Sequence, residues 1–298
     1  MELLWIPIAL GAALFQAVRT AAQKALNAHL STWMVTYVRS LFGLPLMLVY
    51  LAVVITLEGR IWPDTSLAFF AYCAGTGIVQ VMATYLLIRL FTMSNFAVGT
   101  VLTKSDVMLA AVIGSVFFSE QIDAIGWLAI SLTIVGVVLL SLRRAGALGG
   151  GIAAGPMAVG LTAAFLFCLS YLFLREASLV LEDGSALWRA AWSVVTVTTM
   201  QSVGLGAWLL TRRSERAEFA ALPRLWRPVW FVGVTSALGS IGWFAAMALE
   251  NASYVKAVGQ VEVVFTVLIS LLYFREAITR LEYVGIATIV VAVLLFVL

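Results

Sequence analysis

Ten apolar runs, each long enough to cross a lipid bilayer as a helix, follow one another along this chain of 298 residues. A bilayer core of roughly 30 Å is spanned by about 20 helical residues. Because 63% of the residues are hydrophobic and only 11% are charged, the chain lacks the polar residues that a soluble domain needs. The pattern predicts an all-α integral membrane protein with ten transmembrane helices, the second of them kinked at Pro45. The predicted spans are residues 4–23, 33–57, 66–88, 95–118, 125–142, 156–174, 186–211, 228–249, 252–274 and 281–298.

The second half of the sequence repeats the first. A shift of 156 residues superimposes Asn95–Leu142 on Asn251–Leu298 without a gap and gives 11 identities in 48 positions. Apolar identities are expected by chance in such a chain, but the match of Glu120 with Glu276 is not. We therefore expect two repeats of five helices each. The expected domains are a first repeat at residues 1–142, a Gly-rich linker at 143–155 and a second repeat at 156–298.

Basic residues fall mainly in alternate loops. The loops that follow odd-numbered spans hold eleven of the 18 Lys and Arg residues, whereas the loops that follow even-numbered spans hold three. Because Lys and Arg are retained on the cytoplasmic side, the odd loops are predicted to be cytoplasmic and both termini to lie on the other side. Five spans in each repeat also require the second copy to be inverted relative to the first.

Two long segments carry a resemblance to a known family. They read SNFAVGTVLTKSDVMLAAVIGSVFFSEQI and NASYVKAVGQVEVVFTVLISLLYFREAI, each with a Glu closing its fourth helix, and the second span contains YVRSLFGLP. Over its whole length the chain resembles the ten-helix, EamA-type members of the drug/metabolite transporter superfamily. The resemblance implies a central cavity, peripheral fifth helices, alternating access and a place in a bacterial-type inner membrane. Many relatives carry a Pro in the middle of each fourth helix, where this chain reads SDVML and VEVVF.

Six charged residues lie inside the predicted spans, where each charge costs at least ~2.5 kcal/mol and so needs a partner or a wet cavity. The repeat places Asp106 and Glu262 at related positions, which suits a pair of proton-coupling carboxylates at a central site. In an alternative reading the carboxylates are only ion paired. Asp106 would then pair with Arg19 or Arg39, and Glu262 would pair with Lys256. The six residues are Arg19, Arg39, Lys104, Asp106, Lys256 and Glu262.

Other polar and aromatic residues inside the spans could bind a substrate. On the first helix, Gln16, Arg19 and Gln23 recur on one face, which must therefore meet protein or water. The four cations outnumber the two carboxylates, which favours a ligand with a carboxylate or phosphate group. For the aromatic residues, packing is the alternative role. The substrate-binding candidates are Gln16, Arg19, Arg39, Gln80, Tyr85, Lys104, Tyr171, Trp243, Lys256 and Gln260.

Several chemistries lack the residues they need. His29 is the only histidine, Cys73 and Cys168 lie in separate spans, and phosphate-loop and hydrolase motifs are absent. We therefore expect no enzyme activity, no metal, no cofactor and no nucleic-acid partner. The expected partners are a small-molecule substrate, the lipid bilayer and a second copy of the chain in a homodimer.

The predicted function is secondary transport of small polar metabolites by alternating access. Export of amino acids or related metabolites fits best, with a proton gradient as one candidate energy source. The alternative within transport is an exchanger of organic anions or phosphorylated metabolites. The alternatives from another class are a component of a lipid-linked flippase and a membrane scaffold that transports nothing.

Overall fold

The computed structural model describes residues 3–93, 103–142, 154–265 and 280–296, and within these ranges the chain is helical without a strand. The predicted linker at 143–155 lies outside the described residues except for its last two. Six helical segments are long and apolar enough to cross a membrane, which confirms a multi-pass, all-α membrane protein. They are α1 (Trp5–Leu26), Thr32–Glu58, α4 (Leu67–Met93), α8 (Ala154–Leu179), α9 (Ala186–Thr211) and α11 (Trp226–Leu249).

Shorter helices complete the bundle. The apolar helix α6 belongs to the fourth predicted span, and α7 and α14 to the fifth and tenth. A short helix and a 3-10 turn lie in the long connection between α9 and α11. The bounds are α6 (Asp106–Phe117), α7 (Ala124–Leu142), α10 (Arg213–Glu218), η1 (Phe219–Ala221), α12 (Ala252–Gly259) and α14 (Arg280–Leu295).

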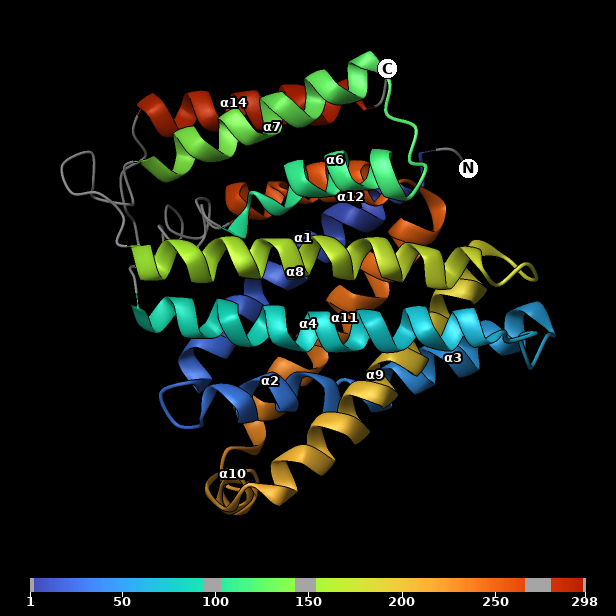
Figure 1. Cartoon of the computed structure of the whole chain (residues 1–298), viewed down its shortest axis with the longest axis vertical. Coiled ribbons are helices and arrows are strands. Elements are labelled where there is room, and N and C mark those ends of the chain that lie inside the picture. Colours follow the sequence, from blue (N-terminus) through green and yellow to red (C-terminus); the bar gives the residue numbers. More distant parts are fainter. Residues whose placement is uncertain (1–2, 94–102, 143–153, 266–279, 297–298) are drawn as a thin grey trace.

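Helix packing follows the duplication. The first helix of each repeat packs along the third helix of the other, α1 on α11 and α8 on α4. The two fifth helices, α7 and α14, pack on each other at the edge of the molecule, as Figure 1 shows. The peripheral position expected for the fifth helices is thereby confirmed. The repeats are interlocked, since each long helix of one repeat has its main neighbour in the other.

The connections between helices separate into two groups at opposite ends of the bundle. In Figure 1 the α3–α4, α6–α7 and α8–α9 connections lie at the right, together with the start of α1 and the end of α14. The α1–α2 connection and α10 lie at the opposite end. We call the right-hand end in this view the even-loop end.

Three predicted spans are broken. The second consists of α2 (Thr32–Leu41) and α3 (Leu44–Glu58), with Pro45 in the first turn of α3, where its missing N–H leaves no bond unmade. The ninth span breaks at Gln260, and the fourth span has a turn at Lys104, the repeat-related position. Continuous helices were expected there, and that expectation is wrong. At Gln260 the side chain bonds back to the carbonyl of Lys256, which competes with the helical backbone bond.

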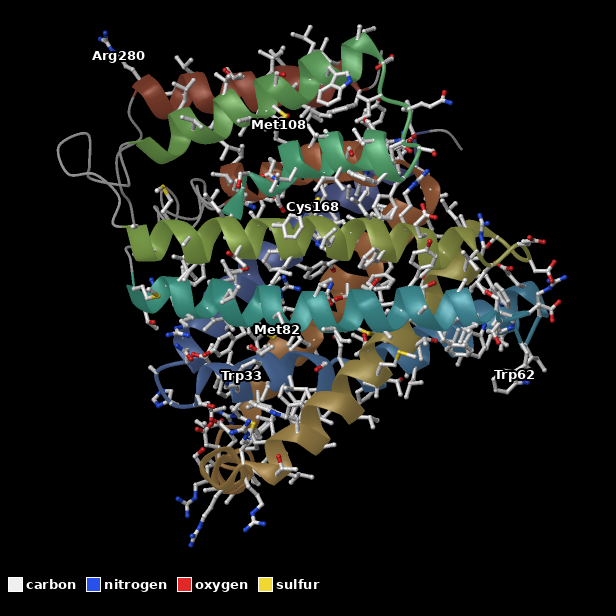
Figure 2. All side chains as sticks on the ribbon, in the orientation of Figure 1. Trp33, Trp62, Met82, Met108, Cys168 and Arg280 are labelled. Atoms are coloured by element: carbon white, nitrogen blue, oxygen red, sulfur yellow. The ribbon has the colours of Figure 1, made fainter. Side chains whose placement is uncertain are left out.

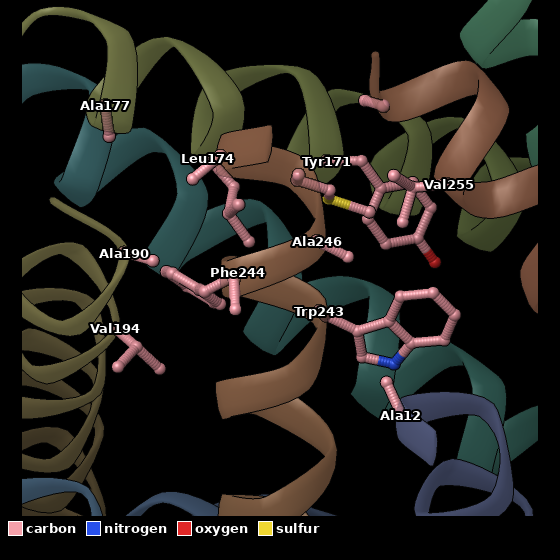
Figure 3. Packing of buried hydrophobic residues seen from close by; sticks show 14 of the residues in the cluster. Ala12, Tyr171, Leu174, Ala177, Ala190, Val194, Trp243, Phe244, Ala246 and Val255 are labelled. Carbon is pink, nitrogen blue, oxygen red and sulfur yellow. The ribbon is translucent and has the colours of Figure 1, made fainter. Parts of the chain in front are cut away.

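Large apolar side chains cover the outside of the bundle (Figure 2). Leu57, Leu67 and Phe117 are 76% to 87% exposed, a pattern that water disfavours and lipid accommodates. Inside, α8, α9 and α11 pack small and large residues together, as the close view in Figure 3 shows for Leu174, Val194 and others. This core holds the central helices around the polar residues described next.

Candidate functional site

Two ion pairs at the centre of the bundle join the repeats. The Lys104 Nζ lies 2.7 Å from Glu262 Oε2, and the Lys256 Nζ lies 3.7 Å from Asp106 Oδ2. Both lysines therefore face a carboxylate of the other repeat. Both carboxylates are thus ion paired, as the alternative reading of the sequence had it, but the partners that reading named, Lys256 for Glu262 and an arginine for Asp106, are wrong. Lys256 and Glu262 are six residues apart and separated by the break at Gln260, which turns them toward different neighbours.

Aromatic rings enclose Lys256. Its Nζ lies 4.1 Å from the ring centre of Tyr171 and 4.6 Å from that of Trp243, both within cation–π range. Figure 3 shows the two rings close to each other between α8 and α11. The Trp243 indole N–H donates to Gln16 Oε1 (2.9 Å), and Gln16 donates to Glu262 (3.4 Å). One hydrogen-bonded network thus connects α1, α11 and the segment that follows α12.

The remaining two cations form no salt bridge with a carboxylate among the described residues, although Arg19 lies within electrostatic range of Glu262. Arg39 is 4% exposed and donates only to neutral acceptors, namely Gln80 (2.6 Å), Thr84 (3.2 Å) and Gln201 (3.4 Å). Arg19 is 6% exposed and donates to Gln16 (3.0 Å), while its Nε has no partner in the described part of the chain. The sequence has four cations and two carboxylates inside the predicted spans, and these two arginines are the cations left over after the two lysines are paired.

A small cavity lies between these side chains. Its volume is about 20 Å³, room for roughly one water molecule. The space that these described side chains enclose is therefore too small for a substrate molecule. We call the residues of the two ion pairs and this lining the central cluster. The lining includes Gln16, Arg19, Arg39, Gln80, Tyr171, Ser240 and Trp243.

The sequence profile of the EamA-like transporter family matches residues 3–142 and, a second time, residues 155–298. The chain belongs to the EamA-like transporter family. A solved structure described only as "Crystal structure of protein" is similar over 99% of this chain and 97% of its own, with a TM-score of 0.71 and 13% identity. At that identity the similarity shows the fold alone. No functionally curated protein matches the sequence.

In this EamA-like transporter, six of the predicted substrate-binding residues line the cavity and three more lie beside it. Lys104 and Lys256 belong to the ion pairs, and Gln260 is bonded to the backbone of Lys256. Tyr85 lies elsewhere, stacked on Trp33 with ring centres 3.9 Å apart. Its role in binding stays a prediction.

Gln201 and Thr84 also belong to the site, although the sequence pattern did not predict them. Gln201 donates to Gln80 (2.9 Å) and accepts from Arg39, so it completes the shell of amides around that guanidinium. The signal was present, because Gln201 is an amide in the middle of the seventh predicted span, as Gln80 is in the third. A threonine such as Thr84 gives no such signal, since its hydroxyl can bond within its own helix.

An apolar groove of about 550 Å³ runs between α4 and α9 of this EamA-like transporter. Trp33 and Met82, both labelled in Figure 2, lie along it. Gly77 and Gly204 widen it, and Gln201 lies at its polar margin. The groove therefore approaches the central cluster from the side of the bundle that faces lipid.

Proposed function

We propose that this EamA-like transporter moves small polar metabolites that carry a carboxylate, and that it exports amino acids or related compounds by alternating access. The proposal includes ten spans in two inverted repeats, cytoplasmic odd loops and no covalent chemistry. The observation that carries it is the pair of buried arginines, Arg19 and Arg39, that line one cavity without a salt bridge to a carboxylate in the described residues, Arg39 having only neutral hydrogen-bond acceptors.

An anionic group would compensate these arginines. Buried charges are expensive unless paired, and a guanidinium binds a carboxylate with two parallel hydrogen bonds. An amino acid also brings an ammonium group. Asp106 offers an acceptor for it, since its Oδ1 is buried and has no hydrogen-bond partner in the described part of the chain. The site thus provides charges of both signs for a zwitterion.

Alternating access is supported by the volume of the cavity. Pockets that enclose small ligands measure about 300–1,000 Å³. A cavity of about 20 Å³ cannot hold an amino acid, so the helices around it must separate before substrate binds. The breaks at Lys104 and Gln260 supply places in the fourth and ninth spans where such movement can occur.

The decisive experiment measures transport in proteoliposomes with a panel of labelled amino acids. Arg39→Gln and Arg19→Gln should each reduce the transport rate at least tenfold. Arg60→Gln is the matched control, because Arg60 pairs with Asp183 in an exposed loop. Undiminished amino-acid transport by Arg39→Gln would contradict the binding role of this arginine.

Proton coupling is a separate part of the proposal. An ion pair favours the ionised carboxylate, so proton uptake by Asp106 or Glu262 requires its lysine partner to move away during the cycle. We expect Glu262→Gln to keep exchange of labelled for unlabelled substrate and to lose accumulation driven by a pH gradient. Transport that is indifferent to the proton gradient would rule out this coupling.

Two of the alternative functions are each favoured by one feature of the structure. The uncompensated arginines also suit an exchanger of organic anions or phosphorylated metabolites, which the same panel tests by adding those compounds. The groove between α4 and α9 suits an amphipathic, lipid-linked substrate. Gly204→Ala would narrow the groove without a clash, because a Cβ at Gly204 meets no atom within 4 Å. Only an amphipathic substrate should be affected by that change.

A further inference from the structure

The chain reverses direction after α6, so that Glu120 packs against the last turn of that helix. Helix α6 ends at Phe117, and the chain reverses at Ser119, whose φ of 54° is the only positive value at a non-glycine residue in the described ranges. The Glu120 N–H then donates to the carbonyl of Gly114 (3.1 Å). Gly114 leaves the space for the returning side chain, since a Cβ there would lie 2.7 Å from Glu120 Oε2.

The carboxylate of Glu120 caps a helix of the other repeat. It accepts hydrogen bonds from the backbone N–H groups of Ala252 (2.8 Å) and Ser253 (3.4 Å) and from the Ser253 hydroxyl. These groups belong to the first turn of α12, whose free N–H groups carry partial positive charge. Because the Glu120 side chain is 1% exposed, the first repeat binds the start of α12 without competition from water.

Arg175 binds the C-terminal end of α11, the helix that precedes α12, next to Glu120. Its Nη1 donates to the carbonyls of Met247 (3.0 Å) and Glu250, at the C-terminal end of α11, and its Nε lies 3.9 Å from Glu120 Oε1. An acid at the start of α12 and a base at the end of α11 thus fix the turn between these helices. We call Glu120, Arg175 and the backbone groups that they bind the latch.

The latch lies between an outer pocket and the central cluster. A pocket of about 440 Å³ at the even-loop end is lined by Glu120, Arg175, Glu176 and neighbouring residues. Cys168 is not part of this lining and lies near the middle of α8 in Figure 2, seven residues before Arg175. Cys168 is fully buried and within electrostatic range of both Glu120 and Asp106. Along α8 the order from the surface inward is therefore Arg175 of the latch, then Tyr171 of the central cluster, then Cys168.

We propose that the latch closes the path between the central cluster and the even-loop end, and that release of Glu120 from α12 opens it. This inference rests on the proposed alternating access and identifies Glu120 as its gating residue. The turn between α11 and α12 is the element that moves, because the latch bonds both of its helices.

Cys168 provides a native reporter for the test. In purified Cys73→Ser protein in detergent, Cys168 is the only thiol, and its rate of modification by a charged maleimide measures access past the latch. Glu120→Gln removes the charge at nearly constant size. Gly114→Ala keeps Glu120 but displaces its carboxylate. Both changes should raise the labelling rate at least tenfold.

Glu176→Gln is the matched control, since the Glu176 carboxylate lines the same pocket and has no hydrogen bond or salt bridge in the described residues. It should label at the rate of the parent. The proposal is overturned if Glu120→Gln and Gly114→Ala, both eluting as folded protein, label no faster than the parent, or if Glu176→Gln labels as fast as they do. Should one of the two variants not fold, the other decides alone. The assay contains no substrate, so a failed transport assay leaves its result intact.

Discussion

At the scale of single residues, the pairing of Lys256 with Asp106 determines which substitutions should compensate each other. Both side chains are at most 5% exposed, and removal of one partner leaves a buried charge unpaired. Lys256→Met should therefore destabilise the protein by about 3 kcal/mol, measured by thermal or chemical unfolding. Adding Asp106→Asn should restore most of that stability. Rescue by Glu262→Gln, with none by Asp106→Asn, would contradict the observed pairing.

Gly259 leaves the space that the Trp243 ring occupies. A Cβ at Gly259 would lie 2.3 Å from the Trp243 ring, so Gly259→Ala should push the indole away from Lys256. The overpacking should cost about 1–3 kcal/mol in unfolding free energy. Gly11→Ala is the control, because nothing lies within 4 Å of a Cβ at Gly11. Equal stability of the two variants would show that the Trp243 ring moves freely.

The sequence could identify the charged residues of the central cluster but not their partners. A charge inside a predicted span must meet a partner or water whichever way its side chain points. Arg19, Lys104 and Glu262 could therefore be identified from their charge and their position in the spans alone. Which cation faces which carboxylate depends on the rotation of each helix and on the break at Gln260. Hydrophobic periodicity reports neither the rotation nor the break, so the partners named in the ion-pair alternative were wrong.

At the scale of helices, the reversal after α6 contains a strained residue. Ser119 has a φ of 54°, in the left-handed region that glycine adopts without a steric penalty. Ser119→Gly should stabilise the protein by about 1 kcal/mol. The inverse change is available at Gly59, which ends α3 with a φ of 68° and has open space around it. Gly59→Ala should destabilise by a similar amount, and unfolding midpoints that shift in the same direction for both would refute the strain argument.

The helices themselves were predictable, and their interruptions were not. Long apolar runs located α1, α4, α8, α9 and α11 because only a helix satisfies its own backbone in lipid. Pro45 marked the break between α2 and α3. The turns at Lys104 and Gln260 contain no proline, and at Gln260 a side-chain bond to the preceding turn accompanies the break. Such bonds depend on rotamers that a sequence pattern does not specify.

At the scale of the whole molecule, the arrangement of the connections predicts how the protein lies in the membrane. Asp64 is exposed at the even-loop end, and Ala217 is exposed in α10 at the other end. If basic loops are cytoplasmic, Asp64→Cys should react with an impermeant thiol reagent in intact cells and Ala217→Cys should not. The native Cys73 and Cys168 are buried and give little background. Labelling in the opposite pattern would reverse the orientation.

The ion pairs that cross between the repeats also have a consequence for biosynthesis. Lys104 and Asp106 are translated about 150 residues before the partners that neutralise them, Glu262 and Lys256. At a synthesis rate of ~5–20 residues per second, these charges of the first repeat stay unpaired for roughly 8–30 s. During that interval its polar faces must stay near water, in the translocation machinery or at the membrane surface, because lipid cannot solvate them. Insertion of the first five helices should therefore be completed only when the ninth span arrives.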